Sequence, residues 1–151
     1  MLKRLADLFE GDPDQFITPS LTGEVDERGK HEANYLTIHE PITPAKWQEH
    51  LDGKVRIGVR PENNDKCKWG CIDIDSYAGF DHKKLLNKIH TLELPLVVCR
   101  SKSGGLHIYI FMKEEISAQT MRDALLTLLL PLDLKRTTEL YPKQVELVRD
   151  E

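Results

Sequence analysis

Long apolar segments and a secretory signal are both missing from this sequence. No apolar stretch approaches the roughly 18 residues that are needed to cross a bilayer. The first residues mix charges among their apolar positions, whereas a secretory signal has a continuous apolar centre. We therefore expect a cytoplasmic protein without a membrane partner.

Cysteines are few, and their number is odd. Cys67 and Cys71 form a C-x3-C pair, and Cys99 is the third. Such a small, odd set does not suit a disulfide scaffold. The pair could supply two zinc ligands, but no second close pair of Cys or His completes the site. Burial of reduced thiols is the preferred interpretation.

An excess of positive charge is also lacking. The chain of 151 residues has 21 Lys and Arg against 25 Asp and Glu, a formal net charge of −4. Nucleic-acid-binding domains are usually basic, so any affinity for DNA or RNA must come from a local patch. With 40% hydrophobic residues the chain can bury a core, and its length fits one domain.

Hydrophobic periodicity and turn residues predict the order of helices and strands. Helices are expected over residues 1–10, 44–51, 81–90 and 117–129, and strands over 35–38, 55–59, 69–75, 95–99, 106–111 and 138–141. Residues 11–34 are polar and predict a long loop or mobile flap. The nearly continuous apolar run at 95–99 is typical of a buried strand, with 106–111 as its hairpin partner. Interleaved strands and helices predict an α/β or α+β layered domain.

The clearest chemical pattern is Asp73-Ile74-Asp75. In a strand, alternation points both carboxylates to one face and the flanking isoleucines to the other. Adjacent carboxylates repel each other, and a bound divalent cation offsets that repulsion. Magnesium and manganese prefer such oxygen ligands. The pair therefore predicts a metal site, with a solvated acidic pair as the alternative.

A second pattern is the glycine-containing turn Arg-Ser-Lys-Ser-Gly-Gly at residues 100–105. Its two glycines let the backbone approach an anion, and turn N–H groups can surround phosphate oxygens. The side chains of Arg100, Lys102 and Ser103 add donors. The turn predicts phosphate binding, with an ordinary glycine hairpin turn as the alternative.

Two further groups follow along the chain. His107 lies just inside the next strand, on the same face as Tyr109 and Phe111. Glu139 lies at the end of a short strand in Glu-Leu-Tyr-Pro-Lys-Gln, and Lys143 follows it. These residues could complete a metal site and contact phosphate, although alone the segment is ordinary surface sequence.

In order and spacing, these motifs resemble the archaeo-eukaryotic primase superfamily, which includes the primase-polymerases of phages and mobile elements. That family has an acid-x-acid strand, a Ser-x-His-type motif on a later strand and a third acid beyond it. The corresponding segments here are Asp73/Asp75, Ser103-Gly-Gly-Leu-His107 and the segment of Glu139. Three residues separate the serine from the histidine, where the family has one. The resemblance covers roughly residues 45–144.

The resemblance implies an α+β primase catalytic core with a mixed β-sheet, partly like an RNA-recognition motif and flanked by helices. A single domain over residues 1–151 is expected, with a helix and loop at 1–34 and the catalytic core at 35–151. The chain ends soon after Glu139. This leaves open a domain truncated at its C-terminus and, with it, the activity of this chain alone.

The function implied by the resemblance is that of a DNA primase or primase-polymerase. It would join ribo- or deoxynucleotides on a single-stranded DNA template during replication, with two Mg²⁺ or Mn²⁺ ions. Asp73, Asp75 and Glu139 would be the catalytic metal ligands. The implied nucleotide-binding residues are Arg100, Lys102, Ser103, Gly104, His107 and Lys143. Nucleoside triphosphates, template, primer and a helicase of the same protein or operon are the implied partners.

Three alternatives come from other classes. A primase-like module could bind nucleotide or nucleic acid without catalysis. A glycosyltransferase with a D-x-D metal site is disfavoured by the third acid and by the Gly-Gly-Leu-His turn. A replication-initiation nuclease needs two nearby histidines on one strand, and Tyr109 stands where the partner of His107 would be.

Overall fold

The structure, a computed structural model, describes residues 2–25, 31–75, 80–101 and 104–143. The chain forms two compact units, residues 1–60 and 61–151. In the described residues there are four helices and two antiparallel sheets, so the expectation of an α+β protein is confirmed. None of the described helices has the length and apolar character that a membrane crossing requires.

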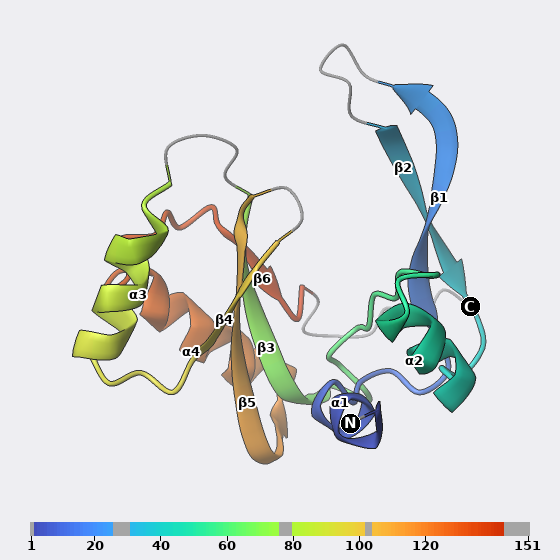
Figure 1. Ribbon diagram of the computed structural model, residues 1–151. Coiled ribbons are helices and arrows are strands. Elements are labelled where there is room, and N and C mark those ends of the chain that lie inside the picture. Colours follow the sequence, from blue (N-terminus) through green and yellow to red (C-terminus); the bar gives the residue numbers. More distant parts are fainter. Residues whose placement is uncertain (1, 26–30, 76–79, 102–103, 144–151) are drawn as a thin grey trace. The chain divides into compact units, whose positions relative to one another are not determined.

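The first unit contains a long two-stranded ribbon. The elements of this unit are α1 (Leu2–Leu8), β1 (Phe16–Val25), β2 (His31–Ile38) and α2 (Pro44–Leu51). β1 and β2 pair in antiparallel fashion, with Phe16 opposite Ile38 (Figure 1). The prediction of a loop over residues 11–34 was therefore wrong. Tyr35 and Leu36 are both exposed. Backbone hydrogen bonds hold the ribbon together, so its strands do not need the alternation of apolar and polar residues by which a strand is predicted from sequence.

The segment after α2 also differs from its prediction. Thr43 caps α2, because its hydroxyl accepts a hydrogen bond from the Lys46 N–H at 3.2 Å. Residues 55–59 form no regular strand. Only Gly58 pairs with β1, through two backbone hydrogen bonds of 2.9 and 2.7 Å with Ile17. An apolar run of this length predicts a strand, but here a single bridge is formed.

The second unit has the order β3 (Lys66–Ile74), α3 (His82–Thr91), β4 (Val97–Arg100), β5 (Leu106–Ser117), α4 (Ala118–Leu129) and β6 (Glu139–Tyr141). The sheet order is β4-β5-β3-β6, and every described pairing is antiparallel. This is the split βαβ arrangement that RNA-recognition motifs share. The expected mixed sheet was wrong: β3 and β4 run in the same direction, but β5 lies between them.

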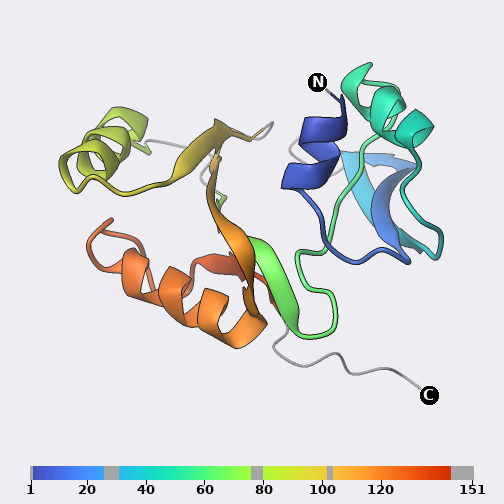
Figure 2. The ribbon, with the colours of Figure 1, turned by 90° about the horizontal axis from the view of Figure 1, so that it is seen from below.

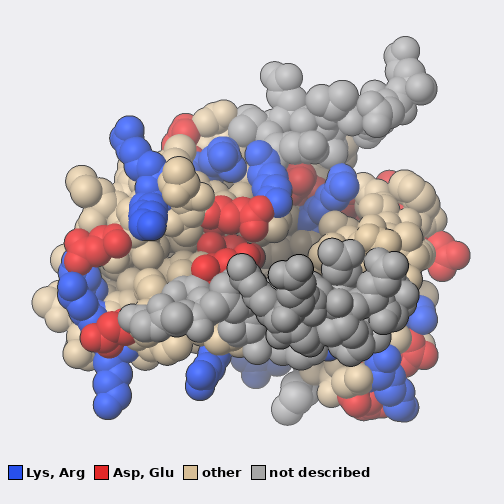
Figure 3. Space-filling view, turned by 90° about the horizontal axis from the view of Figure 1, so that it is seen from above, with Lys and Arg blue, Asp and Glu red and all other residues tan. Residues whose placement is uncertain are grey.

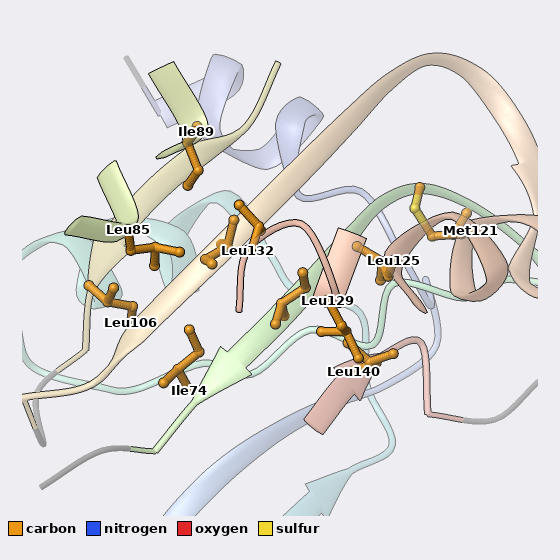
Figure 4. Packing of buried hydrophobic residues seen from close by; sticks show 12 residues of the cluster. Ile74, Leu85, Ile89, Leu106, Met121, Leu125, Leu129, Leu132 and Leu140 are labelled. Carbon is orange, nitrogen blue, oxygen red and sulfur yellow. The ribbon is translucent and has the colours of Figure 1, made fainter. Parts of the chain in front are cut away.

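Both helices of this unit cover the same face of the sheet (Figure 2). Alternate residues of β3 and β5 point toward these helices. The apolar residues of the two strands, spaced two apart, and those of the helices, spaced three or four apart, therefore pack into one core. Figure 4 shows this packing, in which the buried residues are Cys67, Ile72, Ile74, Leu85, Ile89, Leu106, Ile108, Met121, Leu125, Leu129, Leu132 and Leu140. The other sheet face is left for polar and aromatic side chains.

Both helices begin at a side-chain N-cap. The Asp81 carboxylate accepts a hydrogen bond from the Lys84 N–H at 2.9 Å. The Ser117 hydroxyl accepts one from the Thr120 N–H at 3.0 Å. Each side chain satisfies an N–H group that the first helical turn leaves without an internal partner. The predicted helices at 81–90 and 117–129 are thus confirmed.

β4 was expected to be buried, and that expectation was wrong. Among the strands that the structure describes, it lies at the edge and pairs only with β5. Val97 and Cys99 are exposed, while Val98 packs against the core. The predicted hairpin partnership with β5 is confirmed. The continuous apolar run indicated a strand correctly but not how many of its faces are covered.

The turn between β4 and β5 packs against the end of β3. A Cβ atom on Gly105 would lie 1.9 Å from the Ile74 carbonyl oxygen, so only glycine allows this approach. Its neighbour Gly104 has φ of +90° and open space around it. One glycine is thus required by contact and the other by backbone conformation.

We predict that Gly105→Ala destabilises the protein more than Gly104→Ala does, by up to roughly 3 kcal/mol, since a backbone atom must move to admit the methyl group. Gly104→Ala is the matched control, because it meets no atom and costs about 1 kcal/mol through its positive φ. Urea unfolding measures both. An equal or smaller loss for Gly105→Ala would contradict the packing described.

Candidate metal and nucleotide site

Four strands each contribute one residue to a single cross-strand row. Asp73 lies opposite His107 on β5 and opposite Glu139 on β6, and His107 lies opposite Cys99 on β4. Directly opposed residues point to the same face of a sheet. The flanking isoleucines of β3 face the helices, so this row lies on the opposite face. Two of the three predicted acids and the predicted histidine are therefore cross-strand neighbours.

Asp73, His107 and Tyr109 form a connected series. The His107 Nε2 atom lies 3.4 Å from Asp73 Oδ1, and Nδ1 lies 3.2 Å from the Tyr109 hydroxyl oxygen. Burial raises the pKa of Tyr109, so its hydroxyl keeps its proton. The donor of this pair depends on the histidine tautomer: in the tautomer whose Nδ1 accepts from the hydroxyl, the ring proton is on Nε2, toward Asp73. Tyr109 thus orients the histidine, a role the sequence did not reveal.

Opposing effects act on the Asp73 carboxyl. Burial raises its pKa most, His107 lowers it, Asp75 and Glu139 raise it, and Lys143 lowers it, with a net increase. The carboxylate is therefore incompletely stabilised by the surrounding groups. A divalent cation would stabilise the charged form, and its preferred ligands are oxygens of this kind. Asp73 thus fits a metal ligand on electrostatic grounds.

The other two acids are placed differently. Asp75 follows the last residue of β3 and is exposed. Glu139 forms an ion pair with Lys143. Across the described ranges, no group of three or more His, Cys, Asp or Glu side chains is close enough to hold one metal ion. The fold brings Asp73 and Glu139 onto paired strands but does not gather all three carboxylates into one cluster.

The predicted phosphate-binding turn is closed by its own backbone. The Ser101 N–H donates to the Gly105 carbonyl at 2.9 Å, and the Gly104 N–H donates to the Ser101 carbonyl at 3.2 Å. Arg100 is exposed at the end of β4. Lys102 and Ser103 lie outside the described residues.

His82 holds this turn from α3, and sequence reasoning missed it. Its Nε2 atom lies 3.1 Å from the Gly104 carbonyl oxygen. The two residues are 22 positions apart, and no local pattern connects them. The start of α3 therefore sets the position of the turn next to β3.

Aromatic rings extend the row's face along β3 and β5. The rings of Tyr109 and Phe111 stack with centroids 5.8 Å apart. The ring of Trp69 meets Tyr109 edge-on at 6.0 Å. The predicted shared face of His107, Tyr109 and Phe111 follows from the register, since their partners on β3 alternate in the same way.

The cysteines are free thiols, and two of them are buried. Burial raises the pKa of Cys67 to about 11 and that of Cys71 as well. Both remain protonated at neutral pH, so burial of reduced thiols is found as expected. Cys99 is exposed at the end of the row.

Positively and negatively charged side chains lie close together at the end of the sheet that carries Asp73, His107 and Glu139. Figure 3 views the molecule from the side where β3 ends and β5 begins; acidic side chains gather near the middle of the view, with Lys and Arg beside them. The side chains of Glu139 and Lys143 are 41% and 54% exposed, so a ligand can reach them from solvent. The arrangement suits a ligand that combines a cation with an anion, such as a metal nucleotide.

We predict that Asp73→Asn stabilises the metal-free protein at neutral pH. The pKa of this carboxyl is higher in the folded chain than its ordinary value of 3.8. Its contribution to stability is thus complete below about 3.8 and is lost as pH rises through the folded-state pKa. Thermal unfolding in EDTA should give a higher midpoint for the variant at pH 7, with the difference shrinking toward pH 4.

Asp52→Asn is the control of opposite sign. Hydrogen bonds from Gln48 and then Lys54 lower the pKa of Asp52, so this substitution should not stabilise the protein at pH 7. A midpoint for Asp73→Asn below that of the wild type at pH 7 would contradict the described electrostatics.

Comparison with known families identifies the family of the chain. The chain matches the family described as TOTE conflict system, Archaeo-Eukaryotic Primase domain, over residues 24–149. No curated protein matches it. The matched range includes every strand of the candidate site and most of the chain. The resemblance drawn from the three sequence motifs is thereby confirmed, and the chain belongs to the archaeo-eukaryotic primase domain family of TOTE conflict systems.

Proposed function

We propose that this chain is a primase-polymerase that joins nucleotides on a single-stranded DNA template. The observation that carries the proposal is the cross-strand row. It sets the acid of the first motif, the histidine of the second and the acid of the third on adjacent strands and on one face. Family membership gives nucleotides and nucleic acid as the general substrate class.

Asp73, Asp75 and Glu139 would hold Mg²⁺ or Mn²⁺ in this proposal. The ions, when bound, would activate the primer 3′-hydroxyl and stabilise the leaving pyrophosphate. The raised pKa of Asp73 supports its role as a ligand, because a cation relieves the cost of an ionised, half-buried carboxylate. Asp75 and Glu139 are exposed enough to reorient toward the same ion.

The triphosphate of the incoming nucleotide would lie beside the metal ligands, on the His107 side of the cross-strand row. His107 would donate from Nε2 to a phosphate oxygen, in the tautomer whose Nδ1 accepts from the Tyr109 hydroxyl. The side chains of Arg100, at the end of β4, and of Lys143 would supply further donors, and Gly104 would let the turn approach the phosphates without a side chain in the way. Lys102 and Ser103 would complete this binding set.

Template and primer would require only a local basic strip, because phosphate contacts dominate nucleic-acid affinity. A net charge of −4 does not prevent this. A helicase encoded in the same protein or operon would supply single-stranded template. The incoming substrates would be ribo- or deoxynucleoside triphosphates.

A primer-synthesis assay with labelled nucleotides, single-stranded DNA and Mg²⁺ or Mn²⁺ tests the proposal. We predict that the double variant Asp73→Ala, Asp75→Ala loses at least 100-fold in rate, on the order of what removal of a charge-stabilising group costs. Asp123→Asn, an exposed acid on α4, is the control and should keep wild-type activity.

Two outcomes would contradict the proposal. Normal primer synthesis by the double variant would exclude these acids as the metal site. Metal-dependent nucleotide binding without any synthesis by the wild type would instead favour the non-catalytic primase-like module.

A further inference from the structure

We propose that Lys143 competes with the divalent cation for Glu139, so that nucleotide binding, by drawing Lys143 onto the triphosphate, opens the third acid to the metal. This inference rests on the proposed function of the same site. It adds a regulatory role for one residue: metal and nucleotide would bind with positive coupling because they displace the same internal ion pair.

The ion pair is the first observation. The Lys143 Nζ atom pairs with Glu139 Oε1, four residues earlier in the chain. The same Nζ atom lies 5.1 Å from the centroid of the Tyr141 ring, which attracts a cation through its face. Glu139 is therefore already neutralised by a cation from within the protein.

The backbone around this pair is fixed from α4. The Arg122 Nη1 atom donates to the Pro142 carbonyl at 3.0 Å and approaches the Leu140 carbonyl at 3.5 Å. Leu140 and Pro142 are both buried. With the chain held on each side of Tyr141, the side chain of Lys143 can change partner by rotation, without displacement of β6.

The charges of the pair extend to Asp73. Glu139 raises the pKa of Asp73 and Lys143 lowers it. Lys143 therefore acts on the carboxylate that would bind the metal first, in the same direction as a metal would. Two cations that stabilise the same carboxylates compete, since each reduces the negative charge available to the other.

A triphosphate provides the alternative partner for Lys143. Lysine binds phosphate as a flexible point charge, and a charged acceptor outcompetes a solvent-exposed ion pair, which is weak. Once Lys143 has moved, the Glu139 carboxylate no longer has a competing cation and can bind the metal. Because coupling between two ligands is reciprocal, bound metal would raise nucleotide affinity through the same exchange.

The experiment measures Mn²⁺ binding to nucleotide-free protein by the electron paramagnetic resonance signal of free Mn²⁺. Lys143→Met should bind Mn²⁺ roughly two- to fivefold more tightly than the wild type, which is the fold-change expected from an exposed ion pair. Lys143→Arg keeps the charge and should leave the affinity near that of the wild type. Asp73→Asn should lose this binding.

Lys46→Met is the matched control, because Lys46 pairs with Glu49 at the same carboxylate exposure of 41%. It should not change Mn²⁺ affinity. In a second arm, addition of a nucleoside triphosphate should increase protein-bound Mn²⁺ more in the wild type than in Lys143→Met. Circular dichroism checks that each variant folds.

The outcomes separate this inference from the proposed function. If the wild type binds Mn²⁺ and Asp73→Asn does not, the metal site is confirmed. Equal or weaker Mn²⁺ binding by Lys143→Met would then contradict the proposed competition between Lys143 and the metal. If neither the wild type nor Lys143→Met binds Mn²⁺ in a way that depends on Asp73, the metal site itself fails, and the inference fails with it.

Discussion

The pairing register of β3 between β5 and β6 determines both the core and the candidate site of the second unit. Asp73 opposite His107 and Glu139 means that Ile72 lies opposite Ile108 and Leu140. A slip of one residue would turn the acids toward the helices and the isoleucines toward solvent. Burial of the isoleucines against α3 and α4 therefore also determines the positions of the residues in the cross-strand row on the other face.

This arrangement explains how a half-buried acid persists on the sheet. Asp73 keeps its place because its neighbours on β3 bury large apolar side chains, although its own ionisation is disfavoured by burial. His107 and Lys143 offset part of that cost. The site thus has an incompletely compensated negative charge, which is the condition under which a bound cation contributes most.

The sequence predicted the parts of the fold that depend on local signals. Asp81 and Ser117 cap their helices, and the spacing of apolar residues identifies the buried face of each. The ribbon of β1 and β2 was missed because its pairing uses backbone groups and leaves residues such as Tyr35 exposed. The edge position of β4 depends on strand order, which no local pattern contains.

The same distinction applies to the site. Asp73, His107 and Glu139 were identified from motif order, and the register makes them neighbours. The contacts of His82 with Gly104 and of Arg122 with Pro142 join residues about twenty positions apart, so sequence spacing could not predict them. The assignment of the metal and of nucleotide chemistry to this row remains our proposal.

Paramagnetic broadening of backbone NMR signals by Mn²⁺ locates the bound ion, because the effect falls steeply with distance from it. We expect substoichiometric Mn²⁺ to broaden first the signals around Asp73, His107 and Glu139, at the end of β3 and the starts of β5 and β6. Signals at the opposite end of the same sheet, at Lys66 and Ser117, should stay sharp, and Asp73→Asn should abolish the pattern. Broadening centred on another part of the chain, or unchanged in Asp73→Asn, would contradict the proposed metal site.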